Sequence, residues 1–514
     1  MSETAVVNHD ITSGIIYELE DKPPLAQAAL AALQHLMSMF ISIGAPPTII
    51  CKALGMPNEI VIHMACIAFF VSGIGTFIQT NRFGPLGSGL LSIQATSFIF
   101  LTAFISVGFS ARAANPDISD EEVVAVMTGA VILGSLVQMT LSRLTHVLKV
   151  VFTPLVCGIT VTMVGVSLIG VGMSNLVGGP GVTMTLSAQQ LNIDNMVTML
   201  YTLTHLPDMP PELVERINNT AMNIQSVIMR TDEFAALKNV GLGALVLFVI
   251  IFFNCVKSPV LRMCAMVIGF AVGTVVAWFM GMIDLGAATS GLAVFNLPVP
   301  FKYGVSFSSV HTGGFISVAL LYVVSTMEAT GDLSATSMLS RRPTRGPEFI
   351  GRLKGGILCD GFASMVAGIF NSFPMAIFAQ NNGVIQLTGN ASRHVGKYVA
   401  VYLFILGLFP IVGAIFNIIP APVLGGALIL LFGIITATGM RIIFSEPVGR
   451  RSVLIIGISI GAGVGAALQP DFSHALPLWA RDFLHSPVAT GAFMAILTNL
   501  LVPKFDEGDA VAAH

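Results

Sequence analysis

Charged side chains are scarce in this chain. Only 10% of its 514 residues are Asp, Glu, Lys or Arg, whereas about a quarter of an average soluble protein is charged. This deficit excludes an ordinary water-soluble fold, because most of the folded surface cannot then face water. The net charge of −3 is also too small and too dispersed for the basic surface that a nucleic-acid partner requires.

Motifs of metal proteins and enzymes are missing as well. The six cysteines are scattered and form no CxxC pair or Cys/His cluster, so we expect no disulfide framework, metal site or cofactor. No P-loop, nucleophile elbow, metalloprotease helix or dinucleotide motif occurs, so we do not expect an enzyme. Residues 1–21 are polar and acidic and lack the basic start of a signal peptide. The first apolar segment is therefore predicted to stay in the membrane.

Apolar segments fill most of the sequence. Hydrophobic residues make up 54% of the chain, and stretches of about 20 of them, each long enough to cross a bilayer core, follow one another. We predict an all-α polytopic membrane protein with fourteen spans. They lie near 24–45, 59–79, 86–108, 122–142, 150–172, 239–256, 262–283, 313–332, 353–371, 373–388, 398–417, 421–440, 452–469 and 486–503.

The remaining segments are connections and tails. The only long connection is an extramembrane loop at 173–238, in which the amphipathic stretch Glu212–Met229 predicts a surface helix; the alternative is a partly disordered loop. Spans 1–5 therefore lie in 24–172, spans 6 and 7 in 239–283, and spans 8–14 in 284–503. Tails at 1–23 and 504–514 flank them.

The basic residues of the loops predict the orientation in the membrane. With this assignment, 17 of the 24 Lys and Arg residues lie in the two tails and the even-numbered loops, and 7 lie in the odd-numbered loops. Positive loops stay in the cytoplasm, so we expect a multi-pass protein of the plasma (inner) membrane with both termini cytoplasmic.

Two predicted spans are interrupted at matching positions. Fourteen spans divide into two halves of seven, and an odd-numbered half must repeat with inverted topology. The third span begins at Gly84–Gly89, and the third span of the second half, the tenth overall, begins at Asn371–Pro374. Gly and Pro are also simply common in membrane helices. Because the breaks match, we predict that they line a binding site near the middle of the membrane.

Few ionisable residues lie well inside the predicted spans, where a carboxylate costs at least about 2.5–3.5 kcal/mol. Glu328 is able to accept two N–H bonds from a planar ring, as an oxidised purine offers; the alternative is a structural pair. Asp332 shares its helical face, but it lies near the predicted helix end, where a solvated or capping role is equally plausible. Asp360 suits a proton carrier, because burial favours the neutral acid, or a structural strut. His35 is expected to orient a neighbouring group.

Three amides lie at the break of the tenth span. An amide offers both a donor and an acceptor, the pattern needed to read the edge of a purine. We predict that Gln380 is a ligand, whereas Asn381 serves to satisfy the broken backbone; the alternative is that all three amides, Asn382 included, only satisfy the backbone.

These residues carry a family resemblance. Residues 380–389, QNNGVIQLTG, resemble the signature of the nucleobase–ascorbate transporter family, and residues 328–332, EATGD, resemble its eighth-span motif. Asp360-Gly361 and Gln34-His35 resemble the family's ninth-span and first-span motifs. The similarity covers roughly 20–505.

The resemblance implies a fold, a mechanism and a site. Spans 1–4 and 8–11 would form a core domain, and spans 5–7 and 12–14 a gate domain that also mediates a homodimer. The core would move against the gate like an elevator and carry substrate together with protons. The implied substrate-binding residues are Glu328, Gln380, Phe98, Ser97 and Ala379. The implied residues of proton coupling and site support are Asp360, His35, Asp332 and Asn381.

Within this family, Glu328 and Gln380 resemble the purine branch, since the uracil branch typically has a second Glu at the signature position. Ser97 departs from the Asn of some xanthine-selective members and leaves room for an oxygen on the imidazole ring, so we expect urate, xanthine or both as substrate. The alternatives are a uracil or ascorbate carrier of the same family, or an anion exchanger or channel on the same fold.

Overall fold

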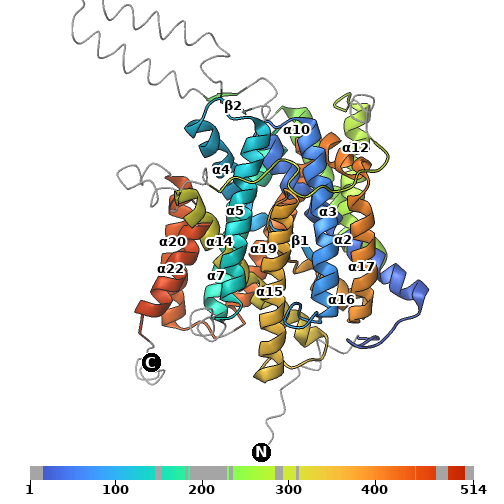
Figure 1. The fold of residues 1–514 in the computed structure, drawn as a ribbon, viewed down its shortest axis with the longest axis vertical. Helices are drawn as coiled ribbons and strands as arrows, with labels where there is room; N and C mark the ends of the chain where they lie inside the picture. Colours follow the sequence, from blue (N-terminus) through green and yellow to red (C-terminus); the bar gives the residue numbers. More distant parts are fainter. Residues whose placement is uncertain are drawn as a thin grey trace, which may run out of the picture.

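A bundle of membrane-length helices makes up the computed structural model (Figure 1). It describes residues 15–144, 153–179, 183–185, 228–230, 236–283, 293–307, 312–445, 447–469, 484 and 486–503. Within these ranges seven helices are long and apolar enough to cross a membrane, or eight if one bent pair counts as a span. The predicted class, an all-α polytopic membrane protein, is confirmed, whereas the count of fourteen spans stays a prediction.

The helices follow the predicted spans closely. Those of the first half are α2 (Leu25–Ala53), α3 (Asn58–Asn81), α4 (Leu101–Ala114), α5 (Asp120–Leu141), α7 (Pro154–Leu176), α10 (Leu237–Cys255), α11 (Pro259–Met263) and α12 (Ala265–Phe279). Those of the second half are α14 (Thr312–Leu339), α15 (Gly346–Ile369), α16 (Gln380–Thr388), α17 (Arg393–Gly407), α18 (Pro410–Ile418), α19 (Ala421–Ile443), α20 (Arg450–Leu468) and α22 (Pro487–Leu501).

The predicted interruption of the third and tenth spans is confirmed. Each break contains a short strand, β1 (Gln94–Thr96) and β4 (Met375–Ile377), and the two strands pair antiparallel in the middle of the bundle (Figure 1). The first break is longer than predicted, because the third span becomes helical only at the 3-10 turn η1 (Phe98–Phe100). Within the predicted part of the break, position 87 requires glycine, because the φ of Gly87 is +91° and a Cβ there would lie 2.4 Å from the Ile78 carbonyl oxygen.

Three spans differ from their prediction, one by a bend and two by where the helix ends. The eleventh span is not one helix, since α17 and α18 meet at 77°; Phe409 is extended before Pro410, because the proline ring disfavours helical geometry at the preceding residue. The first span does not stop at residue 45, because α2 continues through Pro46 and Pro47, buried among other helices. The eighth span ends seven residues later than predicted, at Leu339.

The predicted surface helix Glu212–Met229 lies mostly outside the described residues. Its last two positions belong instead to β3 (Ile228–Arg230), which pairs antiparallel with β2 (Thr183–Thr185). A strand pair thus replaces the end of that helix.

Helix packing falls into two groups. α3 packs on α17 and α5 on α15, whereas α7 packs on α19 and α20 on α22. Glycines permit the closest of these contacts: a Cβ on Gly425 of α19 would lie 2.2 Å from the Leu176 nitrogen of α7. The division into core and gate domains itself stays a prediction.

The N-terminal segment before α2 is bound to the residues that follow the tenth span. Residues 16–19 exchange backbone hydrogen bonds with residues 389–393, and Glu20 forms an ion pair of 2.7 Å with Arg393. Leu19 is completely buried in a cluster with Leu90, Leu333 and Ile377. The segment therefore packs against both interrupted spans through Leu19.

Replacing Leu19 with Ala should lower the free energy of unfolding by about 3 kcal/mol, because a fully buried leucine leaves a cavity. The measurement is the thermal unfolding of the purified protein in detergent. Ile16→Ala in the same segment is the matched control, since Ile16 is 72% exposed and should change little. Equal melting temperatures for the two variants would show that Leu19 does not hold the segment.

Candidate functional site

The strand pair β1–β4 brings two helix N-termini to the middle of the bundle. The register sets Ala95 opposite Ala376. The pairing extends at both ends, because the Ser97 nitrogen donates to the Pro374 carbonyl at 2.9 Å and the Phe378 nitrogen donates to Ile93 at 3.2 Å. η1 and α4 follow β1, and α16 follows β4. Helix N-termini favour negative charge, so this centre suits a ligand that carries electronegative oxygens.

Asp360 of α15 lies against both strands. Its carboxylate accepts a hydrogen bond from the Gln94 side chain and lies beside the Ile377 backbone. Gln94 and Ile377 are register partners, so one buried carboxylate joins the two interrupted spans. Asp360 is 0% exposed, and none of the described residues forms a hydrogen bond with its second oxygen.

Two further carboxylates lie on α14. Glu328 is half-buried. Asp332, one turn later, is buried, and one of its oxygens has no hydrogen-bond partner within the described part of the chain. Asp332 lies within electrostatic reach of both Glu328 and Asp360. Because α14 continues to Leu339, the alternative of Asp332 as a helix-end cap is wrong.

No basic residue of the described ranges forms an ion pair with any of these three carboxylates. Burying three carboxylates close together, with no described cation paired to them, is unfavourable for the stability of the fold. Such a cluster is what a site that binds a ligand or protons requires.

The amides of α16 have separate surroundings. Gln380 and Ala379 begin the helix and are half-buried. Asn381 is buried and its amide donates to the Leu91 carbonyl of the third-span break. Asn382 accepts a hydrogen bond of 2.7 Å from Thr336 of α14. Of the three amides, Gln380 is thus the one at the helix start that these contacts leave available to a ligand.

His35 of α2 is fully buried beside the Asn381 side chain. Neither ring nitrogen makes a hydrogen bond of regular geometry. His35 therefore lies at the polar centre next to Asn381.

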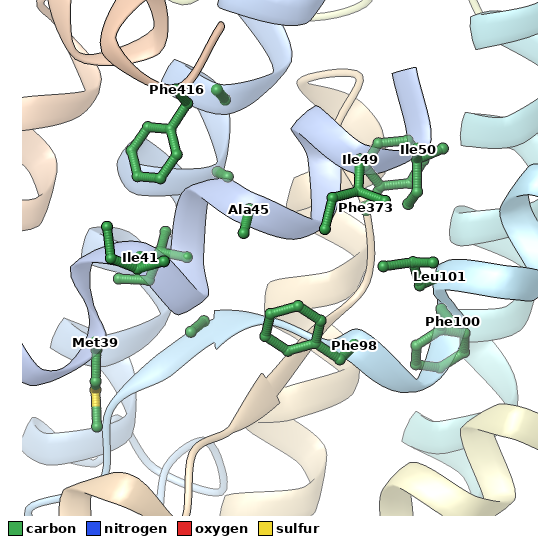
Figure 2. Close-up of a cluster of buried hydrophobic side chains, with 14 of the residues drawn as sticks. Met39, Ile41, Ala45, Ile49, Ile50, Phe98, Phe100, Leu101, Phe373 and Phe416 are labelled. Carbon is green, nitrogen blue, oxygen red and sulfur yellow. The ribbon is translucent and has the colours of Figure 1, made fainter. Parts of the chain in front are cut away.

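Phe98 and Ser97 lie where β1 ends. The Ser97 hydroxyl accepts from the Ile99 nitrogen and caps η1. Phe98 is 4% exposed, and its ring packs edge-on against Phe432 of α19 at 5.3 Å. Figure 2 shows this ring below Ala45 of α2, at the end of the β1 arrow. An aromatic face at this place contacts both the broken span and a helix of the predicted gate.

Two residues of the site, Gln94 and Thr76, were not predicted from the sequence. Gln94 holds Asp360, and its backbone nitrogen donates to the Thr76 hydroxyl of α3 at 3.0 Å. The only signal was a run of polar residues within an apolar break, which does not tell which of them meets the carboxylate.

The sequence matches a known family over most of its length. A family model described as a permease family covers residues 26–205 and 212–472. Two curated relatives from Escherichia coli strain K12 are similar over nearly the whole chain. Xanthine permease XanP is 38% identical over 96% of this chain and 95% of its own length, and xanthine permease XanQ is 38% identical over 97% and 95%.

A solved structure shares the fold. The transmembrane domain of BicA, a bicarbonate transporter of a cyanobacterium, superposes with a TM-score of 0.53 at 15% identity, over 94% of this chain and 99% of that one. At this identity the likeness concerns the inverted-repeat fold alone. The family match and the two relatives show that the chain is a transporter rather than an enzyme, and that it belongs to the nucleobase–ascorbate transporter family.

Proposed function

We propose that this protein is a proton-coupled symporter that takes up an oxidised purine base, xanthine, urate or both. The observation that carries the proposal is the group of three carboxylates, which form no ion pair with any described basic residue, next to paired strands that each lead into a helix N-terminus. The relatives described as xanthine permeases support the choice of substrate.

Glu328 and Gln380 would bind the edge of the base. A carboxylate accepts two adjacent ring N–H groups, and the amide supplies one donor and one acceptor. Phe98 would stack on the ring, since aromatic faces pack well on flat heterocycles, once it leaves its contact with Phe432. Backbone N–H groups near Ser97 and Ala379, at the two helix starts, would donate to the carbonyl oxygens of the purine.

Asp360 would carry the proton. Loading by a proton and a base neutralises part of the charge of the cluster and lowers the cost of moving it through the membrane. Asp332, His35 and Asn381 would support this step. The core helices would then slide past the gate helices, and the Phe98–Phe432 contact would be one of those that change.

We place the protein in the plasma (inner) membrane with both termini cytoplasmic, as a homodimer formed through the gate domain. α2 begins and α22 ends toward the same end of the bundle, the lower end in Figure 1, as an even number of spans requires.

The first test is the uptake of radiolabelled xanthine and urate by cells that express the chain, with and without a protonophore. Accumulation that collapses with the protonophore is the expected result. If neither base enters, the purine proposal is wrong, and uracil, ascorbate and inorganic anions are the next candidates.

Exchanging Ser97 for Asn should lower urate uptake at least about tenfold relative to xanthine uptake. Asn also caps helices well, so η1 should stay intact. Ser97 is only 3% exposed, so the longer Asn side chain should take up the space that the extra oxygen of urate needs. The ratio of the two initial rates is the measurement. An unchanged ratio would show that Ser97 does not set the room for the extra oxygen.

A further inference from the structure

An apolar groove runs along the outside of α3 and α17. It has a volume of about 610 Å³, and every lining residue is Gly, Ala, Val, Ile, Leu or Phe. Half-exposed side chains form its walls, among them Phe77, Phe83, Val401 and Phe404. Phe362 of α15 completes it. The groove is separate from the candidate site, which contains the carboxylates.

Close contacts fix the two helices that form the groove. A Cβ on Gly73 would lie 2.7 Å from the Phe404 nitrogen, and a Cβ on Gly396 would lie 2.4 Å from the Thr80 side chain. α3 and α17 therefore run antiparallel side by side. The last residues of α3 lie next to the first turn of α17.

Two basic residues lie at this end of the groove. Arg82 follows α3 directly and is exposed. Lys397 precedes Ala400 and Val401 by three and four residues, so it lies on the same face of α17 as these lining residues. Its neighbour Gly396 touches Thr80, which brings Lys397 close to the end of α3. The groove is thus apolar along its length and positively charged at one mouth.

We propose that this groove holds an acyl chain of an anionic phospholipid, whose phosphate lies at Arg82 and Lys397. A chain in the groove replaces a chain in the bilayer, so apolar contact alone selects no particular lipid. The headgroup charge makes the difference, and two basic groups at a membrane surface correspond to roughly a thirtyfold preference for an anionic over a zwitterionic lipid.

A lipid in this groove would contact two helices, α3 and α15, that also carry residues of the candidate site. Thr76, which accepts from the Gln94 nitrogen, is on α3, and Phe362 is two residues from Asp360 on α15. The lipid would therefore stabilise the helices that hold the strand pair in position. The proposal does not depend on the identity of the transported substrate.

Native mass spectrometry of the purified full chain tests the proposal directly. The probes are phosphatidylglycerol and phosphatidylcholine with the same oleoyl chains. We expect one phosphatidylglycerol per chain to be retained at concentrations about thirtyfold below those needed for phosphatidylcholine. Two changes should each remove this preference. Val401→Trp fills the groove, and Arg82→Gln combined with Lys397→Gln removes the positive charge at its end.

Matched variants on α20 control for general effects. Val453→Trp changes a valine that is 60% exposed, close to the 51% of Val401, and Arg450→Gln removes an exposed charge elsewhere. Both should keep the wild-type preference. Equal retention of the two lipids by the wild type, or unchanged retention by the groove variants, would overturn the proposal.

A second measurement needs no variant. Phosphatidylglycerol with a photoreactive acyl chain should label peptides within residues 70–86 and 397–404 of the wild-type protein. Labelling confined to other helices would also overturn the proposal.

Discussion

Replacing Glu328 with Gln should weaken purine binding on the order of 100-fold while the protein still folds. Hydrogen bonds to a charged group contribute about 1.5–3 kcal/mol, and an amide in the same place keeps one acceptor but loses the negative charge and turns a donor toward the base. The measurement is the affinity for xanthine in purified protein, together with uptake at saturating substrate.

The surroundings of Glu328 explain why folding should survive. None of the described basic residues forms an ion pair with it, so the substitution leaves no cation unpaired. It also removes one negative charge from the reach of Asp332, which lessens repulsion in the cluster. A stability equal to or above that of the wild type, combined with lost binding, separates a ligand from a structural residue.

Glu121→Gln is the matched control for Glu328→Gln. Glu121 is exposed in the first turn of α5, so this variant removes the same charge far from the strand pair and should bind xanthine normally. Normal binding by Glu328→Gln itself would show that the candidate site is misplaced.

The sequence predicted the fold class because membrane helices leave a strong signal. Apolar stretches of bilayer length have few interpretations, since every backbone polar group in lipid must be satisfied internally. Ends of helices were harder to predict. α14 continues past Asp332 because the residues that follow it are buried among other helices, and hydropathy does not record such tertiary burial.

The candidate site was predicted only in part. Glu328, Asp360 and Gln380 were identifiable because charge and amides inside apolar segments are costly and therefore conspicuous. The pairing of β1 with β4 was not, since three-residue strands carry no usable periodicity. The partnership of Gln94 with Asp360 follows from that register, so it became visible only in three dimensions.

The second large effect concerns Asp360. Asp360→Asn should abolish the accumulation of purine above its external concentration, while counterflow exchange of labelled for unlabelled base continues. Asn has nearly the shape of Asp and still meets Gln94 and the strand backbone, but it cannot gain or lose a proton. The measurement is transport in proteoliposomes, with an imposed pH gradient for accumulation and with none for counterflow.

Two comparison variants make this result specific. Asp117→Asn changes an exposed aspartate before α5 and should leave both activities unchanged. Asp332→Asn removes the other buried aspartate, whose free oxygen makes it the rival proton carrier. Coupling lost in Asp360→Asn and kept in Asp332→Asn assigns the proton to the carboxylate between the strands. Uptake by Asp360→Asn that remains fully driven by the pH gradient would refute the assignment. Loss of coupling in Asp332→Asn alone would assign the proton to Asp332 on α14, next to Glu328, which we expect to bind the base.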